Sequence, residues 1–379
     1  MYKVYRTKHI LNIHKHVDGW FWTKYSADPY IGCEHGCQYC YSRDEKYNPH
    51  KAERDPDVLK FEDPFSEYIK IKENAPDLLM RALRGKPVEE IYLDGYQPIE
   101  TKYRYVRGML SVCLSLGFPV FVNEKSPLLL QDLDLLKEIS LKSHLNVGWS
   151  IITTKDDETR QKLESKAPPT ASRFKAMKQL KDNGIMTGTI FMPILPFIYD
   201  TDENIESVIR MTKESGGEYV LDGGLTLTGY CKTHFYNALQ RFNPSLISKY
   251  EELYKDEKRV GEHEVEVHQK VLQYCKKHNL PDHIPRPVNF YPKALQANKQ
   301  IAAEFHNEAR ELMMTGQRGY REWAYRKAAW ALDDLIESVK KIYREKGITG
   351  LMQIKGIGEK LAKKIEELLG TNLVDERVR

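Results

Sequence analysis

The sequence lacks any long uninterrupted apolar run, and none approaches the ~18 residues that a membrane-spanning helix needs. Its opening segment, MYKVYRTKHILNIHKHVDGW, also lacks the apolar core of a secretory signal peptide. There is no internal repeat and no low-complexity tract. These absences argue against a membrane protein, and we expect the chain to be cytoplasmic.

Cysteine is scarce, with six residues in a chain of 379. Small secreted domains that depend on disulfides are shorter and richer in cysteine, so a disulfide framework is not expected. Three of the cysteines crowd into one segment and three lie far apart: Cys33, Cys37 and Cys40, then Cys113, Cys231 and Cys275.

The chain also has little net charge, +4, which is too small to establish a nucleic-acid partner. The distribution of charge says more. Between Lys340 and Lys364 there are 8 basic and 2 acidic residues, a local charge of 8 − 2 = +6. The charge of this segment alone exceeds the net charge of the whole chain.

With 41% hydrophobic and 30% charged residues, the chain has the composition of an ordinary globular protein. At roughly 150 residues per domain, its length suggests two or three domains. Short apolar runs alternate with helical patterns as far as about residue 230, and we expect strands at residues 90–94, 119–123, 146–152, 186–193 and 219–226. We expect helices between them at residues 105–116, 128–141, 170–183 and 201–215.

Strands separated by helical patterns of this length predict β/α units around a parallel sheet, and hence an α/β fold. Five or six such units fit an open or partial β/α barrel, in which the chemistry gathers at the carboxyl ends of the strands. Residues 230–280 have the pattern of helices, and the proline-rich segment LPDHIPRPVNFYP follows them. Beyond it the chain is helical again, so we expect one domain over residues 1–297 and a second over residues 298–379.

The crowded cysteines stand in the segment DPYIGCEHGCQYCYSR, with the spacing C-x3-C-x2-C. Thiolates bind soft metals and iron–sulfur clusters. A structural zinc ion needs four ligands, and one of four nearby histidines could supply the fourth: His14, His16, His35 or His50. A [4Fe–4S] cluster held by three thiolates would instead leave one iron open for a ligand.

The cysteine spacing, the aromatic Tyr39 before the third cysteine and the β/α pattern that follows resemble the radical S-adenosylmethionine (SAM) superfamily. The resemblance implies a partial (β/α)6 TIM-like barrel, with Cys33, Cys37 and Cys40 as ligands of a [4Fe–4S] cluster. It implies that SAM chelates the fourth iron and is cleaved to a 5′-deoxyadenosyl radical, which abstracts hydrogen from the substrate.

The resemblance also implies contacts to SAM, here assigned by position. Tyr39 would pack near the adenine, and the end of the second strand would receive the methionine amino group. Polar residues after the fourth strand could hold the ribose and the carboxylate, and the fifth strand would offer Ile190 and Met192 to the adenine. The assigned residues of the second and fourth strand ends are Asp94, Gly95, Tyr96, Ser150, Thr153 and Lys155.

Further phrases, among them YQPIE, EKSPLLLQDLDLL and SIITTKDD, resemble the spore photoproduct lyase-like branch, whose founding activity reverses a thymine dimer in DNA. The resemblance covers roughly residues 8–250 and implies a lyase-type role in DNA repair. The chain departs from the lyase in lacking a cysteine on the second strand, where that enzyme carries its hydrogen donor. Tyr41 matches a tyrosine of the lyase and could relay a hydrogen atom.

Near the C-terminus the segment GITGLMQIKGIGEKLAKKIEELLG contains a Gly-x-Gly hairpin between two helical patterns. Such a hairpin beside a helix amino terminus exposes N–H groups and suits phosphate. With WAYRKAAWALDDLI before it, the segment resembles the small all-α helix-hairpin-helix domain of DNA polymerase beta and its relatives. In that domain one lysine forms a Schiff base with an abasic sugar, and Lys364 matches it. The expected DNA contacts are Lys355, Gly356, Gly358, Lys360, Lys363 and Lys364.

The resemblances together imply an enzyme that acts on a DNA lesion and receives electrons from a donor such as flavodoxin or ferredoxin. A radical SAM enzyme that modifies RNA or a peptide stays open as an alternative. A third possibility, from another class, is a non-enzymatic DNA-binding protein with a structural zinc site.

Overall fold

The computed structural model describes residues 1–44, 46–47 and 55–370. The chain divides into two compact units. The first unit contains residues 1–12 and 25–283, and the second contains residues 13–24 together with the chain from Ile284 onward. The second unit therefore begins before residue 298 and includes a piece of the N-terminal region. The functional boundary at 297/298 stays a prediction.

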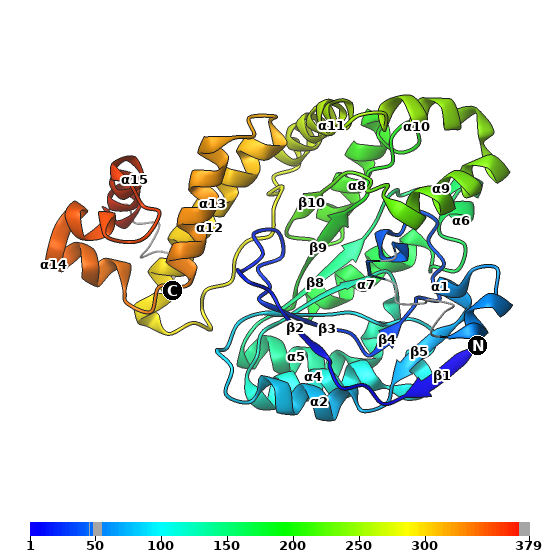
Figure 1. The fold of residues 1–379 in the computed structure, drawn as a ribbon, viewed down its shortest axis with the longest axis horizontal. Coiled ribbons are helices and arrows are strands. Elements are labelled where there is room, and N and C mark those ends of the chain that lie inside the picture. Colours follow the sequence, from blue (N-terminus) through cyan, green and yellow to red (C-terminus); the bar gives the residue numbers. More distant parts are fainter. Residues whose placement is uncertain (45, 48–54, 371–379) are drawn as a thin grey trace. The chain divides into compact units, whose positions relative to one another are not determined.

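The first unit is built on a mainly parallel sheet with the strand order β10-β9-β8-β7-β6-β3-β2 (Figure 1). A smaller sheet has the order β1-β5-β4. The strands are β1 (Tyr2–Tyr5), β2 (Leu11–Ile13), β3 (Tyr25–Ala27), β4 (Tyr30–Ile31), β5 (Ile69–Lys72), β6 (Ile91–Leu93), β7 (Val120–Glu124), β8 (Leu145–Ser150), β9 (Met186–Phe191) and β10 (Val220–Asp222). From β3 through β6 to β10, every neighbouring pair in the large sheet is parallel.

The central strands are rich in apolar residues, which favours their burial on both faces of the sheet. All six residues of β8 are buried, which is typical of parallel sheets covered by helices. Gly148 in β8 leaves room for Ile190 of the next strand, because a Cβ there would lie 2.7 Å from Ile190 Cγ1. Residues on this face of the sheet are therefore closely packed.

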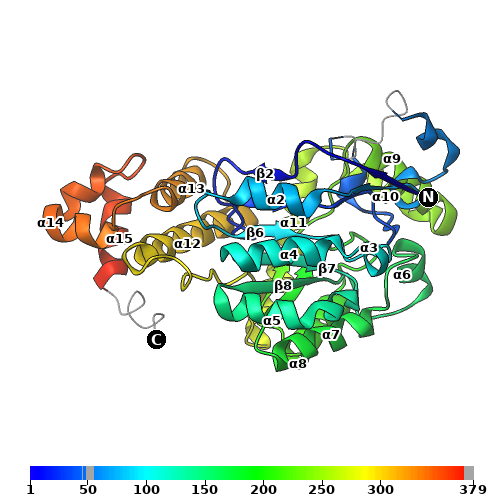
Figure 2. The ribbon, with the colours of Figure 1, turned by 90° about the horizontal axis from the view of Figure 1, so that it is seen from below.

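Helices α2, α4, α5, α7 and α8 line one side of the large sheet (Figures 1 and 2). The helices of the first unit are α1 (Pro64–Glu67), α2 (Ala75–Leu83), α3 (Glu100–Tyr103), α4 (Tyr105–Leu116), α5 (Leu133–Lys142), α6 (Glu158–Leu163), α7 (Thr170–Asp182), α8 (Asp202–Glu214), α9 (Gly229–Phe242), α10 (Ile247–Leu253) and α11 (Glu257–Lys277). The short 3-10 helices are η1 (Tyr41–Arg43), η2 (Pro56–Lys60), η3 (Pro127–Asp132) and η4 (Pro244–Leu246). The five strands and four helices expected between residues 90 and 226 are confirmed, with bounds shifted by a few residues.

The second unit is helical, with α12 (Lys293–Met314), α13 (Tyr320–Asp333), α14 (Val339–Met352) and α15 (Glu359–Gly370). Its apolar core includes Phe305, Leu332 and Ile365. Asn298 connects α12 to the start of α14. Its side-chain amide donates to Glu337 O (2.8 Å), and its side-chain carbonyl accepts from Val339 N (2.9 Å). α12 is therefore anchored by polar as well as apolar contacts.

Residues 13–24 complete the second unit through their aromatic side chains. Trp22 is buried, its indole N–H donates to Ile284 O (2.8 Å), and its ring lies edge-on to His306. Gly19 packs so closely that a Cβ there would lie 2.6 Å from His306 Nδ1. Nearer the start of the segment, His16 stacks on Trp330 with 4.2 Å between ring centroids. This segment is thus an integral part of the core of the second unit.

In the part of the chain that the structure describes, no helix is both long and apolar enough to cross a membrane.

Candidate functional site

The loop that carries the three cysteines, residues 32–40, joins β4 to η1. Its start is fixed by the backbone N–H of Cys33, which donates to Phe65 O (2.9 Å). Gly32 and Gly36 have φ values of +89° and +64°, a region that favours glycine. The two glycines therefore let the loop turn sharply on either side of its first cysteine.

Glu34 ties this loop to the segment that follows β6. One of its carboxylate oxygens accepts from Ile99 N (2.7 Å), and the other accepts from the Tyr2 hydroxyl (2.7 Å). The backbone N–H of Glu34 donates to the side-chain carbonyl of Gln97 (2.7 Å). The sequence reasoning did not single out Glu34, and no local pattern reveals contacts that span more than sixty residues.

The three cysteines are free thiols, of which Cys37 is buried and Cys33 and Cys40 are partly exposed. Burial and then the neighbouring Cys37 raise the pKa of the Cys33 thiol well above its usual range. Burial likewise raises the pKa of the Cys37 thiol to about 11. A bound metal reverses such shifts, because it binds the thiolate and releases the proton.

Among the residues described, no three His, Cys, Asp or Glu side chains already take up the geometry of a closed metal-ion site. The argument for a bound metal cluster therefore rests on the kind and number of ligand atoms in the loop. Three sulfur donors on one short loop, without a fourth cysteine, fit an iron–sulfur cluster with three protein ligands.

The four histidines considered above as a fourth zinc ligand lie in different parts of the chain. His35 lies within the cysteine loop, and both of its buried ring nitrogens lack a hydrogen-bond partner. Burial and then the charge of Lys125 lower the pKa of His35 to about 4, which keeps the imidazole neutral and able to bind a metal. His14 and His16 belong to the second unit, and His50 lies outside the described residues.

The segment after β6 offers its backbone to a carboxylate. The N–H groups of Gly95 and Tyr96 both donate to Glu124 Oε1, at 3.0 and 2.8 Å. Gly95 has a φ of +121°, so a side chain would be strained there. The phenol of Tyr96 is buried and donates to Asp132 (2.9 Å), so this side chain belongs to the core. Of the two residues, only backbone groups face Glu124.

Asp94 comes directly after β6, and Asp28 comes directly after β3. The register of the two strands pairs Ala27 with Leu93, so the two aspartates follow at the same edge. Burial and then the neighbouring Asp28 raise the pKa of Asp94 well above its ordinary value. A carboxyl group that is buried beside a second carboxyl group favours its neutral form.

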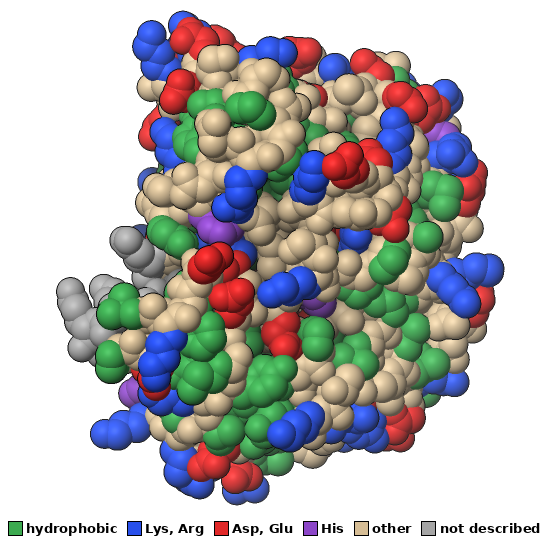
Figure 3. Space-filling model, turned by 90° about the vertical axis from the view of Figure 1, so that its right-hand side faces the viewer, with side chains coloured by type: hydrophobic (Ala, Val, Ile, Leu, Met, Phe, Trp, Pro, Cys, Tyr) green, Lys and Arg blue, Asp and Glu red, His purple; other side chains and the backbone are tan. Residues whose placement is uncertain are grey.

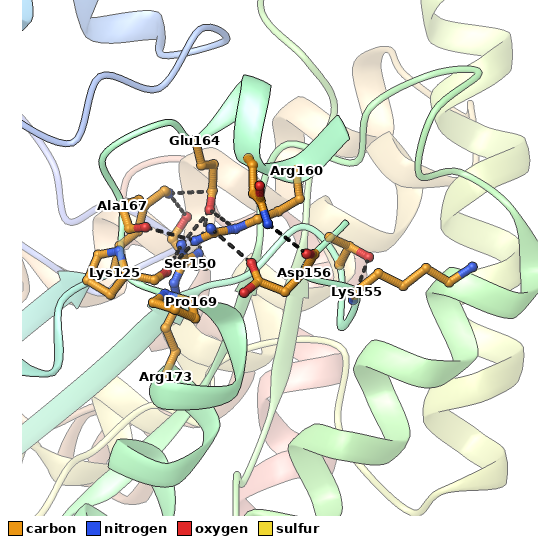
Figure 4. Close-up of polar contacts among 12 residues, drawn as sticks. Lys125, Ser150, Lys155, Asp156, Arg160, Glu164, Ala167, Pro169 and Arg173 are labelled. Atoms are coloured by element: carbon orange, nitrogen blue, oxygen red, sulfur yellow. Dashed lines mark hydrogen bonds and ion pairs between the residues drawn. The ribbon is translucent and has the colours of Figure 1, made fainter. Parts of the chain in front are cut away.

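A buried carboxylate, Glu164, gathers three cationic side chains near the carboxyl ends of β7 and β8 (Figure 4). Arg173 donates to it directly, Arg160 Nε lies 3.4 Å from Oε2, and Lys125 Nζ lies 3.8 Å from Oε1. Lys125 also donates to the hydroxyl of Ser150. Burial alone would raise the pKa of Glu164, but Arg173 and Lys125 lower it to about 2. This cluster carries more positive than negative charge.

Tyr39 of the cysteine loop contacts the same cluster. It is buried, its hydroxyl donates to Glu164, and Lys125 Nζ lies 5.7 Å from the centroid of its ring. The structure thus brings Tyr39 and Ser150, both expected from the sequence, together with Lys125. The sequence reasoning missed Lys125, although a charged residue just after a predicted strand is the signal that could have found it.

The remaining expected residues of the first unit lie in different surroundings. Thr153 is buried and accepts from the backbone N–H of Lys155 (3.1 Å), whereas the Lys155 side chain points away from the Glu164 cluster and pairs with Glu203 (3.3 Å; Figure 4). Ile190 is buried against the face of β8. Tyr41 in η1 is 54% exposed.

In the second unit, the hairpin at Ile354–Gly358 joins α14 to α15. Gly356 has a φ of +86°, and the buried Ile357 anchors the hairpin in the core. The first N–H groups of α15 have no partner within the helix, so they are available to an anion. The exposed lysines around this point are Lys355, Lys360 and Lys363, the last paired with Glu359 (2.7 Å).

Lys364 is partly buried. It pairs with Glu308, and its Nζ lies 5.1 Å from the ring centroid of Tyr325. Although burial lowers the pKa of Lys364, the hydrogen bond to Glu308, the charge of Glu308 and the contact with Tyr325 together outweigh this effect and raise the pKa above its usual value. A nucleophilic amine needs the opposite shift, so this environment does not favour Schiff-base chemistry in the free protein.

The two units differ in how charge is spread. On the face of the molecule drawn in Figure 3, Lys and Arg side chains are interspersed with Asp and Glu. The segment from Lys340 to Lys364, in the second unit, carries the local excess of +6 already counted from the sequence. The basic surface expected for a polyanion is therefore in the second unit.

Comparisons with known proteins agree with this architecture. A family model described as helix-hairpin-helix domain matches residues 296–373. The structure also resembles a mutant of spore photoproduct lyase with dinucleoside spore photoproduct, with a TM-score of 0.50 and 12% identity over 75% of this chain and 81% of that chain. The expected fold class, an α/β partial barrel followed by a small all-α domain that matches the helix-hairpin-helix model, is confirmed.

Relatives found by sequence carry no described activity. An uncharacterized protein of Mycobacterium tuberculosis, Rv2578c, is 27% identical over 61% of this chain and 67% of its own length. An uncharacterized protein of Methanocaldococcus jannaschii, MJ0683, is 30% identical over 50% of this chain and 66% of its own length. These relatives leave the substrate open.

Proposed function

We propose that the chain is a radical SAM enzyme that repairs or modifies a nucleic acid, with a lesion in DNA as its substrate. The observation that carries this proposal is the loop of three free cysteines beside the Lys125–Ser150–Glu164 cluster. The loop offers sulfur to a metal cluster, and the neighbouring side chains offer a cationic and hydroxyl-bearing site to a small zwitterion. The fold, which resembles that of spore photoproduct lyase, supports the same assignment.

Cys33, Cys37 and Cys40 would hold a [4Fe–4S] cluster, and SAM would lie between it and the ends of β6, β7 and β8. The chemistry supplied when both are bound is homolytic cleavage of a carbon–sulfur bond of SAM, which yields a 5′-deoxyadenosyl radical. The protein must position SAM and exclude competing reactions.

The side chains around this site divide the binding of SAM among them. The ammonium group of Lys125 and the hydroxyl of Ser150 are suited to the methionine carboxylate, because charge-assisted hydrogen bonds are the stronger ones. Asp94, beside the backbone of Gly95 and Tyr96, suits the methionine amino group. Tyr39 would pack against the adenine on the far side of Lys125.

Other residues have roles that the surroundings support less directly. Ile190 would pack near the adenine, and Thr153 would hold the ribose through its hydroxyl. Lys155 pairs with Glu203 at the surface, so we assign the carboxylate to Lys125 in its place. Tyr41 would relay a hydrogen atom between the substrate and the site, and its exposed position is compatible with contact to a large substrate.

DNA would bind to the second unit through the N–H groups of the Gly356–Gly358 hairpin and the lysines around it. Such contacts bind the phosphate backbone without reading sequence. Exchange of both Lys360 and Lys363 for Glu should weaken DNA binding and flatten its dependence on salt. An unchanged salt slope would show that DNA binds elsewhere.

The decisive experiment is anaerobic reconstitution with iron and sulfide, followed by incubation with SAM and deuterated oligonucleotides, with and without lesions. Transfer of deuterium into 5′-deoxyadenosine identifies a DNA substrate. Cys33→Ala should abolish 5′-deoxyadenosine formation while the second unit stays folded. Retained SAM cleavage in that variant would refute the proposed cluster.

A second candidate function rests on His35, whose neutral ring could complete a zinc site with the three cysteines. The protein would then be a DNA-binding protein without SAM cleavage. One tightly held zinc ion and no bound iron after reconstitution would favour it. A radical SAM enzyme that acts on RNA or a peptide would cleave SAM but show no salt-sensitive binding to DNA.

A further inference from the structure

Helix α13 exposes aromatic rings next to cationic side chains, and the phosphate contacts proposed above do not use them. Tyr320 is 93% exposed and Trp323 is 48% exposed. Tyr320, Trp323 and Lys327 stand at positions i, i+3 and i+7, so they share one face of the helix. Exposed aromatic rings that lie side by side form an apolar patch, and such patches mark binding surfaces more often than single exposed side chains do.

Neighbouring side chains hold the indole of Trp323 in place. The guanidinium group of Arg326 lies over its ring at 5.2 Å, and the buried Glu322 fixes that guanidinium group through a hydrogen bond of 2.9 Å to Arg326 Nε. Trp330 contacts Trp323 at a ring-centroid distance of 6.3 Å in an edge arrangement. The indole is therefore supported by its neighbours and still presents nearly half of its surface.

This aromatic face adjoins the hairpin. The position that a Cβ would take on Gly356 lies 4.0 Å from Lys327 Cβ, and Lys327 comes one helical turn after Trp323. The phosphate-binding hairpin, Lys327 and the two rings thus form one surface within the second unit. Its exposed cations, Arg321 and Lys327 on α13 together with Lys355 and Lys360, make the surface basic.

We propose that the Tyr320–Trp323 face binds unpaired bases of a DNA strand whose phosphates lie at the hairpin. Bases within a duplex are already stacked on one another, whereas unpaired bases can stack on aromatic side chains at about 1–3 kcal/mol per base. The second unit would therefore favour a single strand, or a distorted stretch of duplex, over intact duplex. This inference rests on the proposed nucleic-acid partner and names the form of DNA that the protein binds.

The preference fits the chemistry proposed for the first unit. An enzyme that acts on a base must extrude it from the stack or wait until the duplex is distorted. A unit that holds unpaired bases keeps such a region open. A protein partner could also cover two aromatic rings, but the surrounding cations favour a polyanion, so we assign the face to DNA.

The test compares the full-length protein with two variants by fluorescence anisotropy, on a labelled single strand of roughly 12 nucleotides and on the matching duplex. Trp323→Ala should weaken single-strand binding about 5- to 150-fold, because one stacking contact is lost. Its affinity for the duplex and the salt slope of both complexes should stay unchanged, because no phosphate contact is removed. Trp323→Phe should restore most of the loss.

Ile336→Ala is the matched control, because Ile336 is 93% exposed and apolar but lies outside α13, in the connection to α14. It should leave both affinities unchanged. Equal losses on single strand and duplex in Trp323→Ala, or no loss on either, would overturn the inference while the proposed DNA partner stands. If the unaltered protein binds neither DNA, the inference and the proposed DNA substrate both fail.

A change of self-association in Trp323→Ala, measured by analytical ultracentrifugation without DNA, combined with unaltered DNA affinity, would also overturn the inference. It would assign the two rings to a protein contact.

Discussion

Glu164 in the first unit and Asp333 in the second are both buried carboxylates surrounded by cationic side chains. Around Asp333 the cations are Arg286 (2.7 Å) and Lys299 (3.7 Å), and the ring of His306 lies 3.4 Å away. Burial would raise the pKa of Asp333, but the charge of Arg286, the hydrogen bond with His306 and the charge of Lys299 hold it below its usual range. In both clusters, neighbouring side chains keep the pKa of a buried carboxyl group below its usual value.

The clusters differ in the surroundings of their lysines. Lys299 is 5% exposed, and its ammonium group also donates to the backbone carbonyl of Asp333 (2.9 Å), so its contacts stay within the second unit. Lys125 is 14% exposed and reaches Ser150 and the ring of Tyr39, on the side of the cysteine loop. A buried ion cluster stabilises a fold when it is closed, and it can bind a ligand when one cation faces outward.

The largest effect should come from opening the closed cluster. Asp333→Asn leaves buried cations without their counter-charge and should lower the free energy of unfolding of the second unit by roughly 3–5 kcal/mol. Urea denaturation followed by tryptophan fluorescence measures this change. The neighbouring Asp334→Asn removes only a half-exposed pair with His16 (3.5 Å) and should cost about 0–1 kcal/mol. Similar losses in both variants would mean that burial of the cluster does not matter.

A smaller effect, on binding rather than on stability, is expected at the open cluster. Lys125→Met removes a charge-assisted hydrogen bond worth about 1.5–3 kcal/mol and should weaken SAM binding about 10- to 150-fold. Titration calorimetry on the anaerobically reconstituted protein measures the affinity, and thermal unfolding should change little. Lys155→Met, which alters the lysine that the sequence favoured, is the control and should leave SAM binding unchanged. The reverse result would return the carboxylate to Lys155.

The smallest effect concerns the acid sensitivity of the first unit. Burial lowers the pKa of His144, just before β8, to about 4. Between pH 6.5 and 4 the unfolded chain binds a proton that the folded first unit does not, so acidification destabilises that unit. Relative to His144→Gln, the wild type should lose about 1–2 kcal/mol of unfolding free energy across this range. Parallel pH profiles of the two proteins would contradict this.

The part of the fold that could be predicted is the part with a local signal. Strands β6 to β10 are short apolar runs between amphipathic helices, and their positions follow from the sequence pattern. Strands β1 to β5 have only two to four residues each, so even the alternating IKIK of β5 is too short to predict a strand. The cysteines were found because their spacing is local, whereas Glu164 and Arg173 join the site only through contacts made by folding.

Residues 13–24 show most clearly why the rest was hidden. Nothing in HKHVDGWFWTK indicates that its tryptophan and histidine side chains belong to a helical core formed more than 260 residues later. Trp22 and Ile284 meet only when the second unit assembles. Sequence patterns report on neighbours along the chain, and this packing involves residues from opposite ends of it.

This segment has a practical consequence for anyone who wishes to dissect the molecule. A fragment that ends at His283 would expose Trp22 to solvent. A fragment that starts at Ile284 would lack Trp22 and His16, which contact His306 and Trp330. The second unit is therefore incomplete without the N-terminal segment. To be made on its own, it would need residues 13–24 fused to it or supplied as a separate peptide.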